Sequence, residues 1–375
     1  MAKRIVVLGT GGSGLTAAIA AHDAGAQVAV FEKHDQVGGT TAWSGGMVWI
    51  PGNRHEAGLD VEDSREKALT YLMALSHDMI PCEMAEAFLD AGPAMVDHLE
   101  ANSPVQFRPI PEFPDYHAEH PGGMPNGGRS LDCPLFSFDE LGEWKDRVTR
   151  SPYYPDPRYS IFDSPLGQAR PVALTEEELA RRAARDERGS GQALAGRLLR
   201  ACLDRGIEPV TNARAVRLIQ QNGAVTGVVI EHDGVERTVE ADAVILATGG
   251  FEWDEDLKRA FLRGPMTHPV SIQTNTGDGL KMAMRVGAQL GNMREAWWMP
   301  VHEVPREDVS TGVVLVAGSR ALPHSIMVNR KGRRFTNEAA NYNAFGAAFH
   351  EQDVSAFDYA NLPCWLVFDQ NYIDR

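Results

Sequence analysis

The sequence predicts an α/β fold, with a parallel sheet in a first domain and a second domain of mixed helices and strands. The short apolar runs at residues 5–8, 27–31 and 243–247 have the character of strands that are buried on both faces of a sheet. The Ala-rich segment 15–24 separates the first two runs and has the composition of a helix. Strand, helix and strand in this order form a βαβ unit, which is typical of a Rossmann-like domain.

A glycine-rich turn connects the first predicted strand to the helix. Glycines in the pattern G-x-G-x-x-G permit a tight turn, close approach of the backbone to a pyrophosphate, and close packing of helix on strand. The phosphates would lie at the helix N-terminus, where unpaired N–H groups and the helix dipole favour an anion. Glu32 ends the second strand, 18 residues after Gly14, and is placed to accept a hydrogen bond from a ribose hydroxyl. The predicted dinucleotide contacts in the turn are Gly9, Gly11, Gly12, Ser13 and Gly14.

Composition and charge narrow the class of protein. The 375 residues are enough for two domains, and the contents of 43% hydrophobic and 23% charged residues are ordinary for a globular chain. A net charge of −15 argues against nucleic acid as a partner. No apolar run approaches the ~20 residues that span a bilayer, so we expect a cytoplasmic protein without a transmembrane segment. The cysteines and histidines show no disulfide or metal-site spacing, and no metal is expected.

The N-terminus allows one alternative reading. Lys3 and Arg4 precede apolar residues, as they would in a signal peptide. Four glycines within residues 9–14 interrupt the apolar stretch that such a peptide needs. The βαβ unit is therefore the better interpretation.

A second loop rich in glycine and hydroxyl residues follows Glu32, at residues 38–46. It supplies backbone N–H groups and hydroxyls beside the same pyrophosphate, whereas NAD-binding Rossmann domains usually continue there with another helix. A flexible surface loop is the alternative, but Trp43, Val48 and Trp49 are interleaved with the polar residues. The stretch resembles the FAD-binding domain, of the glutathione-reductase type, in the fumarate reductase and 3-ketosteroid dehydrogenase superfamily.

This resemblance implies that FAD is the cofactor. Three later segments are similar to the same superfamily: the strand at residues 213–216, the sequence A-T-G-G at 247–250, and T-G-D-G at 276–279. Asp278 also suits the N-cap of the helix that follows it, and both roles can hold together. The further cofactor contacts that the resemblance implies are Lys33, Gly39, Thr40, Thr41, Ser44, Gly45, Gly46, Ala213, Ala215, Ala247, Thr248, Gly249, Asn275, Gly277 and Asp278.

The remaining elements are predicted from periodicity and turn residues. Helices are expected at residues 61–75, 83–102 and 192–204, and a charged, solvated helix capped by Thr175 is expected up to residue 186. Residues 106–134, rich in Pro and Gly, are expected to be irregular. A hairpin is expected across Asp233 and Gly234, and a strand, turn and return at residues 326–338. The domain boundary is placed after residue 270, giving an FAD-binding domain at 1–270 and a substrate domain at 271–375.

Tryptophans mark the expected substrate site. Trp297 and Trp298 stand where fumarate reductases tend to carry a histidine-proline-threonine sequence. A pair of tryptophans is often part of a core, but an aromatic lining also suits a flat hydrophobic substrate and offers nothing to two carboxylates. The sequence E-A-W-W-x-P and residues 44–51 resemble the 3-ketosteroid Δ1-dehydrogenases. By that resemblance, Trp49, Trp297 and Trp298 line the site of a small hydrophobic, steroid-like ketone.

Two tyrosines are the candidate catalytic residues. A loop tyrosine is most often a surface packing residue, but Tyr116 lies in F-P-D-Y and Tyr342 in A-A-N-Y-N, and both resemble active-site segments of the steroid dehydrogenases. The resemblance implies that Tyr342 removes a proton next to the ketone while the adjacent carbon gives a hydride to flavin N5. Tyr116 would support this base by a hydrogen bond. A phenol is mostly protonated at neutral pH, so the tyrosinate needs a stabilising neighbour and the ketone oxygen needs donors.

The sequence thus predicts an FAD-dependent oxidoreductase that desaturates a 3-ketosteroid-like substrate and passes electrons to an unidentified acceptor. A fumarate reductase-like enoate or dicarboxylate oxidoreductase and a non-catalytic FAD-binding fragment remain open alternatives. The second alternative arises because the chain stops at Arg375, partway through the expected second domain. By the resemblance, a C-terminal segment would complete the FAD domain and supply the ketone donors. We therefore expect the substrate domain to be incomplete.

Overall fold

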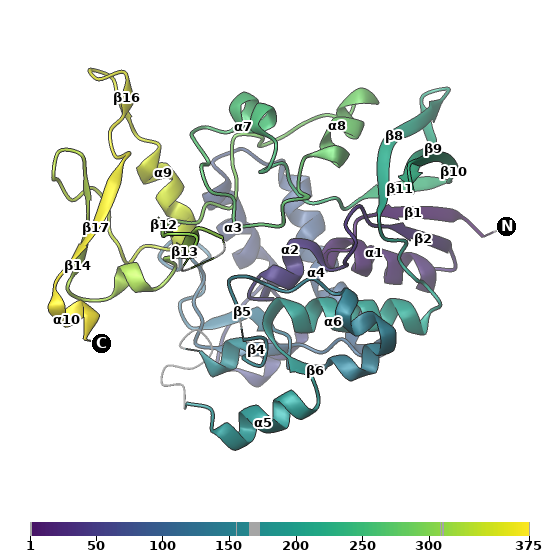
Figure 1. The fold of residues 1–375 in the computed structure, drawn as a ribbon, viewed down its shortest axis with the longest axis horizontal. Coiled ribbons are helices and arrows are strands. Elements are labelled where there is room, and N and C mark those ends of the chain that lie inside the picture. Colours follow the sequence, from purple (N-terminus) through teal and green to yellow (C-terminus); the bar gives the residue numbers. More distant parts are fainter. Residues whose placement is uncertain (1, 155, 165–172, 308, 310, 375) are drawn as a thin grey trace. The chain divides into compact units, whose positions relative to one another are not determined.

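Two compact units make up the chain in the computed structural model (Figure 1). The residues that the structure describes are 2–154, 156–164, 173–307, 309 and 311–374. The first unit combines Met1–Trp253 with Ser271–Gly291, and the second combines Asp254–Val270 with Asn292–Arg375. This division differs from the predicted boundary after residue 270, because the segment that follows it returns to the first unit. Among the described residues, no helix combines the length and apolar character that crossing a membrane requires.

A parallel sheet in the order β11-β1-β2 forms the centre of the first unit. Ile5 in the middle strand pairs with Val28 on one side and with Ala243 on the other. The predicted βαβ unit is confirmed, because a helix connects the first two strands. Its elements are β1 (Arg4–Leu8), α1 (Gly12–Asp23), β2 (Gln27–Phe31) and β11 (Ala243–Leu246).

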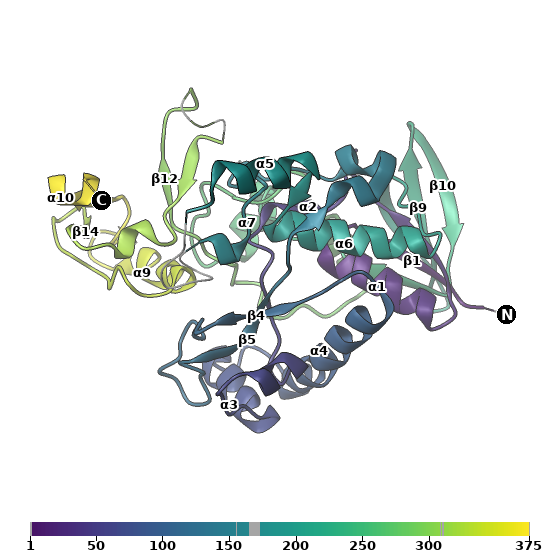
Figure 2. The ribbon, with the colours of Figure 1, turned by 90° about the horizontal axis from the view of Figure 1, so that it is seen from below.

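Alternate side chains of β1 belong to two different hydrophobic cores, because successive residues of a strand point to opposite faces. Val7 packs with Leu15 and Ile19 of α1 and with α6 (Ser190–Asp204). Val6 and Leu8 pack instead in a cluster with residues of an antiparallel sheet. The parallel sheet is therefore the middle of three layers, and Figure 2 shows α1 and α6 side by side.

The antiparallel sheet contains the hairpin that the sequence predicts. Val235 pairs with His232 across the turn, and both turn residues, Asp233 and Gly234, have positive φ angles, of 52° and 72°. Positive φ at two central residues is the geometry of a tight hairpin turn that matches the twist of the strands. The strands are β8 (Ala213–Gln221), β9 (Ala224–His232) and β10 (Val235–Glu240).

Two helices and a small antiparallel sheet in the order β3-β5-β4 form a further part of the first unit. The prediction that residues 106–134 are irregular was wrong, because β4 and β5 both lie there. All six residues of β5 are buried, although Arg129 and Asp132 are charged. In β5, buried ion pairs of Arg129 and Asp132 replace the apolar side chains from which a buried strand is usually predicted. The elements are β3 (Val48–Trp49), α3 (Arg65–Ser76), α4 (Cys82–Asn102), β4 (Arg108–Pro111) and β5 (Gly127–Asp132).

The other described elements of the first unit are short. Thr175 accepts a hydrogen bond from the N–H of Glu178 at 3.2 Å, which confirms the predicted cap of the charged helix, α5. The elements are α2 (Gly39–Trp43), η1 (Arg54–Gly58), β6 (Phe136–Ser137), η2 (Phe138–Arg147), η3 (Ile161–Asp163), α5 (Glu176–Ala184), β7 (Glu187–Arg188) and α8 (Asp278–Arg285).

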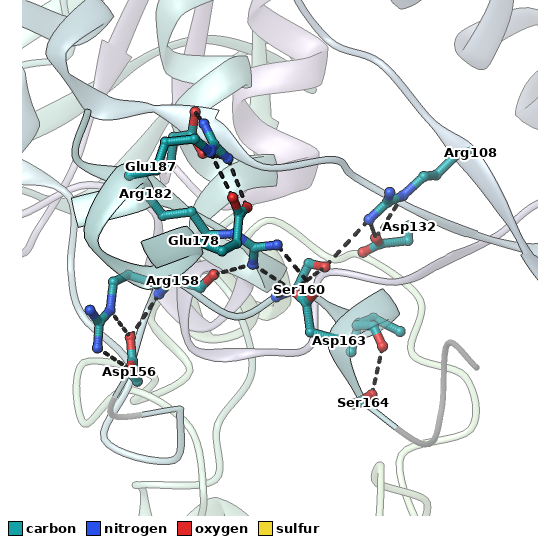
Figure 3. Close-up of polar contacts among 12 residues, drawn as sticks. Arg108, Asp132, Asp156, Arg158, Ser160, Asp163, Ser164, Glu178, Arg182 and Glu187 are labelled. Atoms are coloured by element: carbon teal, nitrogen blue, oxygen red, sulfur yellow. Dashed lines mark hydrogen bonds and ion pairs between the residues drawn. The ribbon is translucent and has the colours of Figure 1, made fainter. Parts of the chain in front are cut away.

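A polar network fixes α5 to the preceding segment (Figure 3). Arg182 is buried and donates to Glu178 at 2.7 Å and to Asp163 at 2.8 Å. Ser160 donates its hydroxyl to Asp163 at 2.8 Å and accepts from Arg108 of β4 at 3.4 Å. The prediction of a solvated helix face was therefore wrong for Arg182, because a carboxylate from outside the helix pairs with it.

The second unit consists of short strands and helices. The strand and turn predicted at residues 326–338 are present, but the return makes only a single bridge, between Val328 and Arg334. The ladder partner of β14 is β17, in which Cys364 pairs with Asn329. The elements are α7 (Glu255–Phe261), β12 (Val301–Glu303), β13 (Val313–Leu315), η4 (Ser319–Ala321), β14 (Ser325–Asn329), η5 (Tyr342–Ala344), α9 (Phe345–Phe349), β15 (Gln352–Asp353), β16 (Asp358–Tyr359), β17 (Cys364–Phe368) and α10 (Gln370–Ile373).

Candidate cofactor and active site

The turn between β1 and α1 presents bare backbone. Gly9 has a φ of +104°, and a Cβ added to it would lie 2.2 Å from the carbonyl oxygen of Ala247. A Cβ added to Gly14 would lie 2.1 Å from the carbonyl oxygen of Gly9. Only glycine fits at these two positions. The turn therefore lets a ligand approach the backbone at the N-terminus of α1, where the helix dipole favours an anion.

Glu32 follows β2 directly and is buried, with 9% of its surface exposed. One carboxylate oxygen accepts from the N–H of Thr10 at 2.9 Å and from its hydroxyl at 2.7 Å. The other oxygen accepts from the N–H of His34 at 2.9 Å. These three donors hold the carboxylate in one orientation. A carboxylate fixed in this way could accept a hydrogen bond from a ribose hydroxyl. Thr10 is not among the residues predicted from the sequence, where its only signal is its place inside the glycine-rich turn.

A cavity of about 300 Å³ lies beside Glu32. Its walls come from segments far apart in the chain: the ends of β1, β2 and β11, the starts of α2 and β8, and the residues before α8. Sixteen of the predicted cofactor residues line it, namely Gly9, Gly11, Gly12, Ser13, Glu32, Lys33, Gly39, Thr40, Thr41, Ala213, Ala215, Ala247, Thr248, Gly249, Asn275 and Asp278. Glycine backbone, hydroxyls and a fixed carboxylate in one cavity suit the phosphates and ribose of a dinucleotide.

The other predicted cofactor residues lie outside this lining and have contacts of their own in the fold. Gly14 closes the first turn, and Gly277, with a φ of +71°, precedes α8. A Cβ added to Gly46 would lie 2.5 Å from the carbonyl carbon of Ser190, so this loop packs against the start of α6. Ser44 and Gly45 belong to the same loop. The cavity is also lined by residues that were not predicted from the sequence, namely Leu8, Thr10, Phe31, Gly250, Glu252, Ile272 and Thr274.

Polar contacts bind residues 271–291 to the rest of the first unit. Asp278 accepts from Lys33 at 3.0 Å and from two nitrogens of Arg214, each at 3.1 Å. Burial tends to raise the pKa of Asp278, but the hydrogen bonds from Arg214 and Lys33 outweigh it and lower the pKa below the ordinary value. Asn275 donates to Thr40 at 3.0 Å. The carboxylate of Asp278 is therefore ionised, and it fixes α8 beside the cavity.

Tyr116, the first candidate catalytic residue, lies in a loop of the first unit and is 38% exposed. The preceding residue, Asp115, is buried and accepts from the indole nitrogen of Trp49 at 2.7 Å. Its other oxygen accepts from Arg129 at 2.7 Å and from the N–H of Met124 at 3.0 Å. The predicted lining residue Trp49 thus helps to hold the loop of Tyr116.

Arg129 is the centre of this buried cluster, with 1% of its surface exposed. It donates to Asp115 and, through two nitrogens, to both oxygens of Asp63. Glu56 lies nearby, and burial together with repulsion from Asp63 raises its pKa to about 7. The cluster therefore contains a carboxyl group that changes its charge near neutral pH.

We expect the Glu56→Gln variant to be more stable than the wild type at pH 8. The raised pKa means that the folded chain holds a proton on Glu56 that the unfolded chain releases above pH 4.5. The wild type therefore loses stability as pH rises from about 4.5 to about 7, whereas the amide does not ionise. Allowing for partial exposure, the gain in free energy of unfolding at pH 8 should be about 1 kcal/mol.

Urea unfolding at pH 5 and pH 8 measures this effect. The exposed Glu208→Gln variant is the matched control and should show no such pH-dependent gain. Equal stability of Glu56→Gln and the wild type at both pH values would contradict the assignment.

The second unit holds the other candidate residues. Trp297 is 74% exposed and donates its indole N–H to the hydroxyl oxygen of Tyr342 at 2.8 Å. Trp298 is 7% exposed, and its backbone N–H donates to Asn343 at 2.8 Å. Of the two tryptophans, only Trp297 has a face that a substrate could contact. Tyr116 belongs to the first unit and Tyr342 to the second.

The cavity and its glycine turn define a dinucleotide-binding protein. A family model described as "FAD binding domain" matches residues 4–372. The chain therefore belongs to this family of flavoproteins, and its cofactor is FAD. The predicted family, fold class and cofactor are thereby confirmed.

Relatives of known activity and structure are similar over nearly the whole chain. The chain is 38% identical to 4-oxocyclohexanecarboxylate 2-dehydrogenase of Sinomonas cyclohexanicum, over 99% of the chain and 65% of that protein. It is 33% identical to 3-oxosteroid 1-dehydrogenase of Mycobacterium tuberculosis (strain ATCC 25618 / H37Rv), over 99% of the chain and 69% of that protein. The solved 3-ketosteroid delta1-dehydrogenase of Sterolibacterium denitrificans, in complex with 1,4-androstadiene-3,17-dione, matches with a TM-score of 0.84 at 32% identity, over 98% of this chain and 69% of that one. The chain thus spans about two thirds of the length of these relatives.

Proposed function

We propose that the chain works, with FAD, as a dehydrogenase that oxidises a CH–CH bond beside a ring ketone. Three relatives support this class, because their names describe dehydrogenases of an oxosteroid and of an oxocyclohexane acid. Both kinds of compound carry a ketone on a carbon ring. The substrate class that they share is therefore a cyclic ketone.

The cavity of the first unit fits the proposed cofactor. The glycine turn and the N-terminus of α1 would hold the pyrophosphate, and Glu32 would hold the ribose. Added Cβ atoms at Gly9 and Gly14 would collide with the backbone of Ala247 and of Gly9, so the shape of the turn depends on these two glycines. When bound, FAD supplies the acceptor for a hydride.

The observation that carries the proposal is the hydrogen bond between Trp297 and Tyr342. An indole N–H that points at the phenol oxygen at 2.8 Å stabilises negative charge on that oxygen. A tyrosinate held in this way can take a proton from the carbon next to the ketone. Tyr342 is the proposed base, and Trp297 positions its oxygen.

Tyr116 has a supporting role in the proposal. Its loop is held by the buried pair of Asp115 and Arg129, with 2.7 Å between their nearest polar atoms. A loop fixed in this way holds the backbone of Tyr116 in a defined position. The ion pair of Asp115 and Arg129 would act indirectly, by positioning Tyr116.

The similarity to two kinds of dehydrogenase leaves two substrate groups within the class. A 3-ketosteroid is the substrate that the exposed indole of Trp297 favours, because a flat aromatic face suits a flat hydrophobic ring system. An oxocyclohexane acid is the second candidate, and the similarity to 4-oxocyclohexanecarboxylate 2-dehydrogenase favours it.

Anaerobic mixing of the FAD-loaded chain with each ketone tests the proposal. A substrate that is oxidised reduces the flavin, so the visible flavin absorbance should disappear with a 3-ketosteroid, with 4-oxocyclohexanecarboxylate, or with both. The compound that gives faster bleaching at equal concentration identifies the substrate group. Fumarate-dependent reoxidation of chemically reduced flavin, without bleaching by either ketone, would instead support a dicarboxylate reductase. Bound flavin that reacts with none of these compounds would overturn the proposal.

A further inference from the structure

The loop that carries Tyr116 closes on itself through backbone hydrogen bonds. The N–H of Asp115 donates to the carbonyl oxygen of Met124 at 2.9 Å. Inside this pair, His120 donates to His117 and Gly123 donates to His120, each at 2.9 Å. Residues 117–123 therefore form two consecutive tight turns, and the side chains on them have a defined backbone.

The same loop is fixed to α3. The N–H of His117 donates to the hydroxyl of Tyr71 at 3.1 Å. A Cβ added to Gly122 would lie 2.1 Å from the carbonyl oxygen of Lys67, so the loop backbone packs directly on the helix. Together with the buried pair of Asp115 and Arg129, these contacts anchor the loop at both ends. An anchored loop loses little conformational entropy when its side chains bind a ligand.

Three metal-ligating side chains point toward one another on this loop. The Nδ1 atom of His117 lies 3.3 Å from the nearer carboxylate oxygen of Glu119, and the Nε2 atom of His120 lies 4.0 Å from the same oxygen. One ligand atom from each of the three residues lies within 4.8 Å of those of the other two. In the part of the chain that the structure describes, this is the one group of three or more such residues that meets that distance.

We propose that His117, Glu119 and His120 bind a divalent transition-metal ion, with Zn²⁺ as the best match. Two imidazoles and a carboxylate form a donor set that Zn²⁺ accepts, and water would complete the coordination. With bonds of about 2.0–2.2 Å, the ligand atoms of a tetrahedral ion are about 3.3–3.6 Å apart. The His117–Glu119 distance of 3.3 Å already meets this value. Rotation of the exposed Glu119 and His120 side chains closes the remaining gap.

A second cluster of histidines and a carboxylate shows what distinguishes this site. His22 and His98 both contact Asp23, at 3.3 and 2.9 Å. Arg205 donates to both oxygens of Asp23, each at 2.7 Å, so the carboxylate already has a cationic partner. The guanidinium neutralises the charge that would attract a metal ion. The Asp23 cluster is therefore a built-in control for nonspecific binding to histidine.

Binding would have a consequence for the proposed dehydrogenase. The ion would lie one residue from Tyr116 and would join both turns of its loop. If Tyr116 supports the base, as proposed above, Zn²⁺ would alter turnover by restricting this loop. The binding site itself is tested without any turnover, so the two proposals can fail separately.

Zn²⁺ titration of the tag-free, chelator-treated chain, in competition with a chromophoric chelator, measures binding. The wild type should take up one Zn²⁺ equivalent that His117→Gln and His120→Gln each weaken at least about tenfold. Glu119→Gln should also weaken binding, and because its side chain is exposed the variant should fold like the wild type, which far-UV circular dichroism checks. The double variant His22→Gln/His98→Gln should bind like the wild type. Co²⁺ should give a visible spectrum that the His117 and His120 variants lose.

Three results would overturn the site. One is the absence of Zn²⁺ uptake by the wild type, and another is unchanged affinity in folded His117→Gln, Glu119→Gln and His120→Gln variants. The third is a loss of binding in the His22/His98 double variant that equals the loss in the loop variants, because it would indicate nonspecific binding to surface histidines.

Discussion

The Tyr342→Phe variant is expected to lose ketone-dependent flavin reduction by a factor of about 10³ while it keeps its bound FAD. Phenylalanine preserves the ring but removes the oxygen that would take the proton from the substrate. Tyr342 is not among the residues that line the cavity that suits FAD, so cofactor binding should not change. Stopped-flow absorbance after anaerobic mixing with the active ketone measures the rate, and the flavin spectrum measures occupancy.

Two further variants make this test specific. Trp297→Phe removes the donor that lies 2.8 Å from the Tyr342 oxygen and should slow reduction about 10²-fold. Tyr359→Phe, in β16 of the same unit, should react at the wild-type rate. Full activity of Tyr342→Phe would remove Tyr342 from the mechanism.

The Gly14→Ala variant is expected to lose bound FAD almost completely. The added Cβ would lie 2.1 Å from the carbonyl oxygen of Gly9 and 3.3 Å from the Cβ of Ala247. Gly9 and Ala247 cannot make room for this Cβ without opening the turn that would hold the pyrophosphate. Overpacking of this kind costs about 1–3 kcal/mol of stability, in addition to the loss of the cofactor site. The ratio of flavin to protein absorbance after purification, together with the thermal unfolding midpoint, measures both effects.

Gly58→Ala is the matched control for the glycine turn. No atom outside its neighbours lies within 4 Å of a Cβ added to Gly58, so this variant should bind FAD as the wild type does. Normal flavin content in Gly14→Ala would show that the turn adapts and would contradict the assigned role.

The sequence predicted the βαβ unit and the FAD cofactor correctly, because their signals are local. A strand, a glycine turn and an acid at a fixed spacing lie within residues 5–32. In the structure the strand belongs to the parallel sheet, and the turn and the acid line one cavity. The contacts among distant segments were harder to predict. Asn275 donates a hydrogen bond to Thr40, which lies 235 positions earlier in the sequence. No local sequence pattern predicts such a bond.

Buried charge explains the largest error in the fold. β5 reads Gly-Gly-Arg-Ser-Leu-Asp and lacks the alternation of apolar and polar residues that indicates a strand. Its arginine is satisfied by Asp63 and Asp115, which lie 66 and 14 positions away. The pairing of β14 with β17 is non-local in the same sense, so the predicted return strand was assigned to the wrong segment. The two tryptophans were alike in sequence, and only tertiary packing separates the exposed Trp297 from the buried Trp298.

The hydrogen bonds of Thr10 matter to anyone who wishes to engineer the cofactor preference of this chain. Its hydroxyl donates to Glu32 and also accepts from the N–H of Gly38, at 3.3 Å, so one side chain connects the turn, the acid and the second loop. Exchanging the acid alone would leave this hydroxyl aimed at a group that is no longer there. Thr10 and Glu32 therefore have to be changed together. The effects of substitutions at the two positions on the free energy of FAD binding should be strongly non-additive.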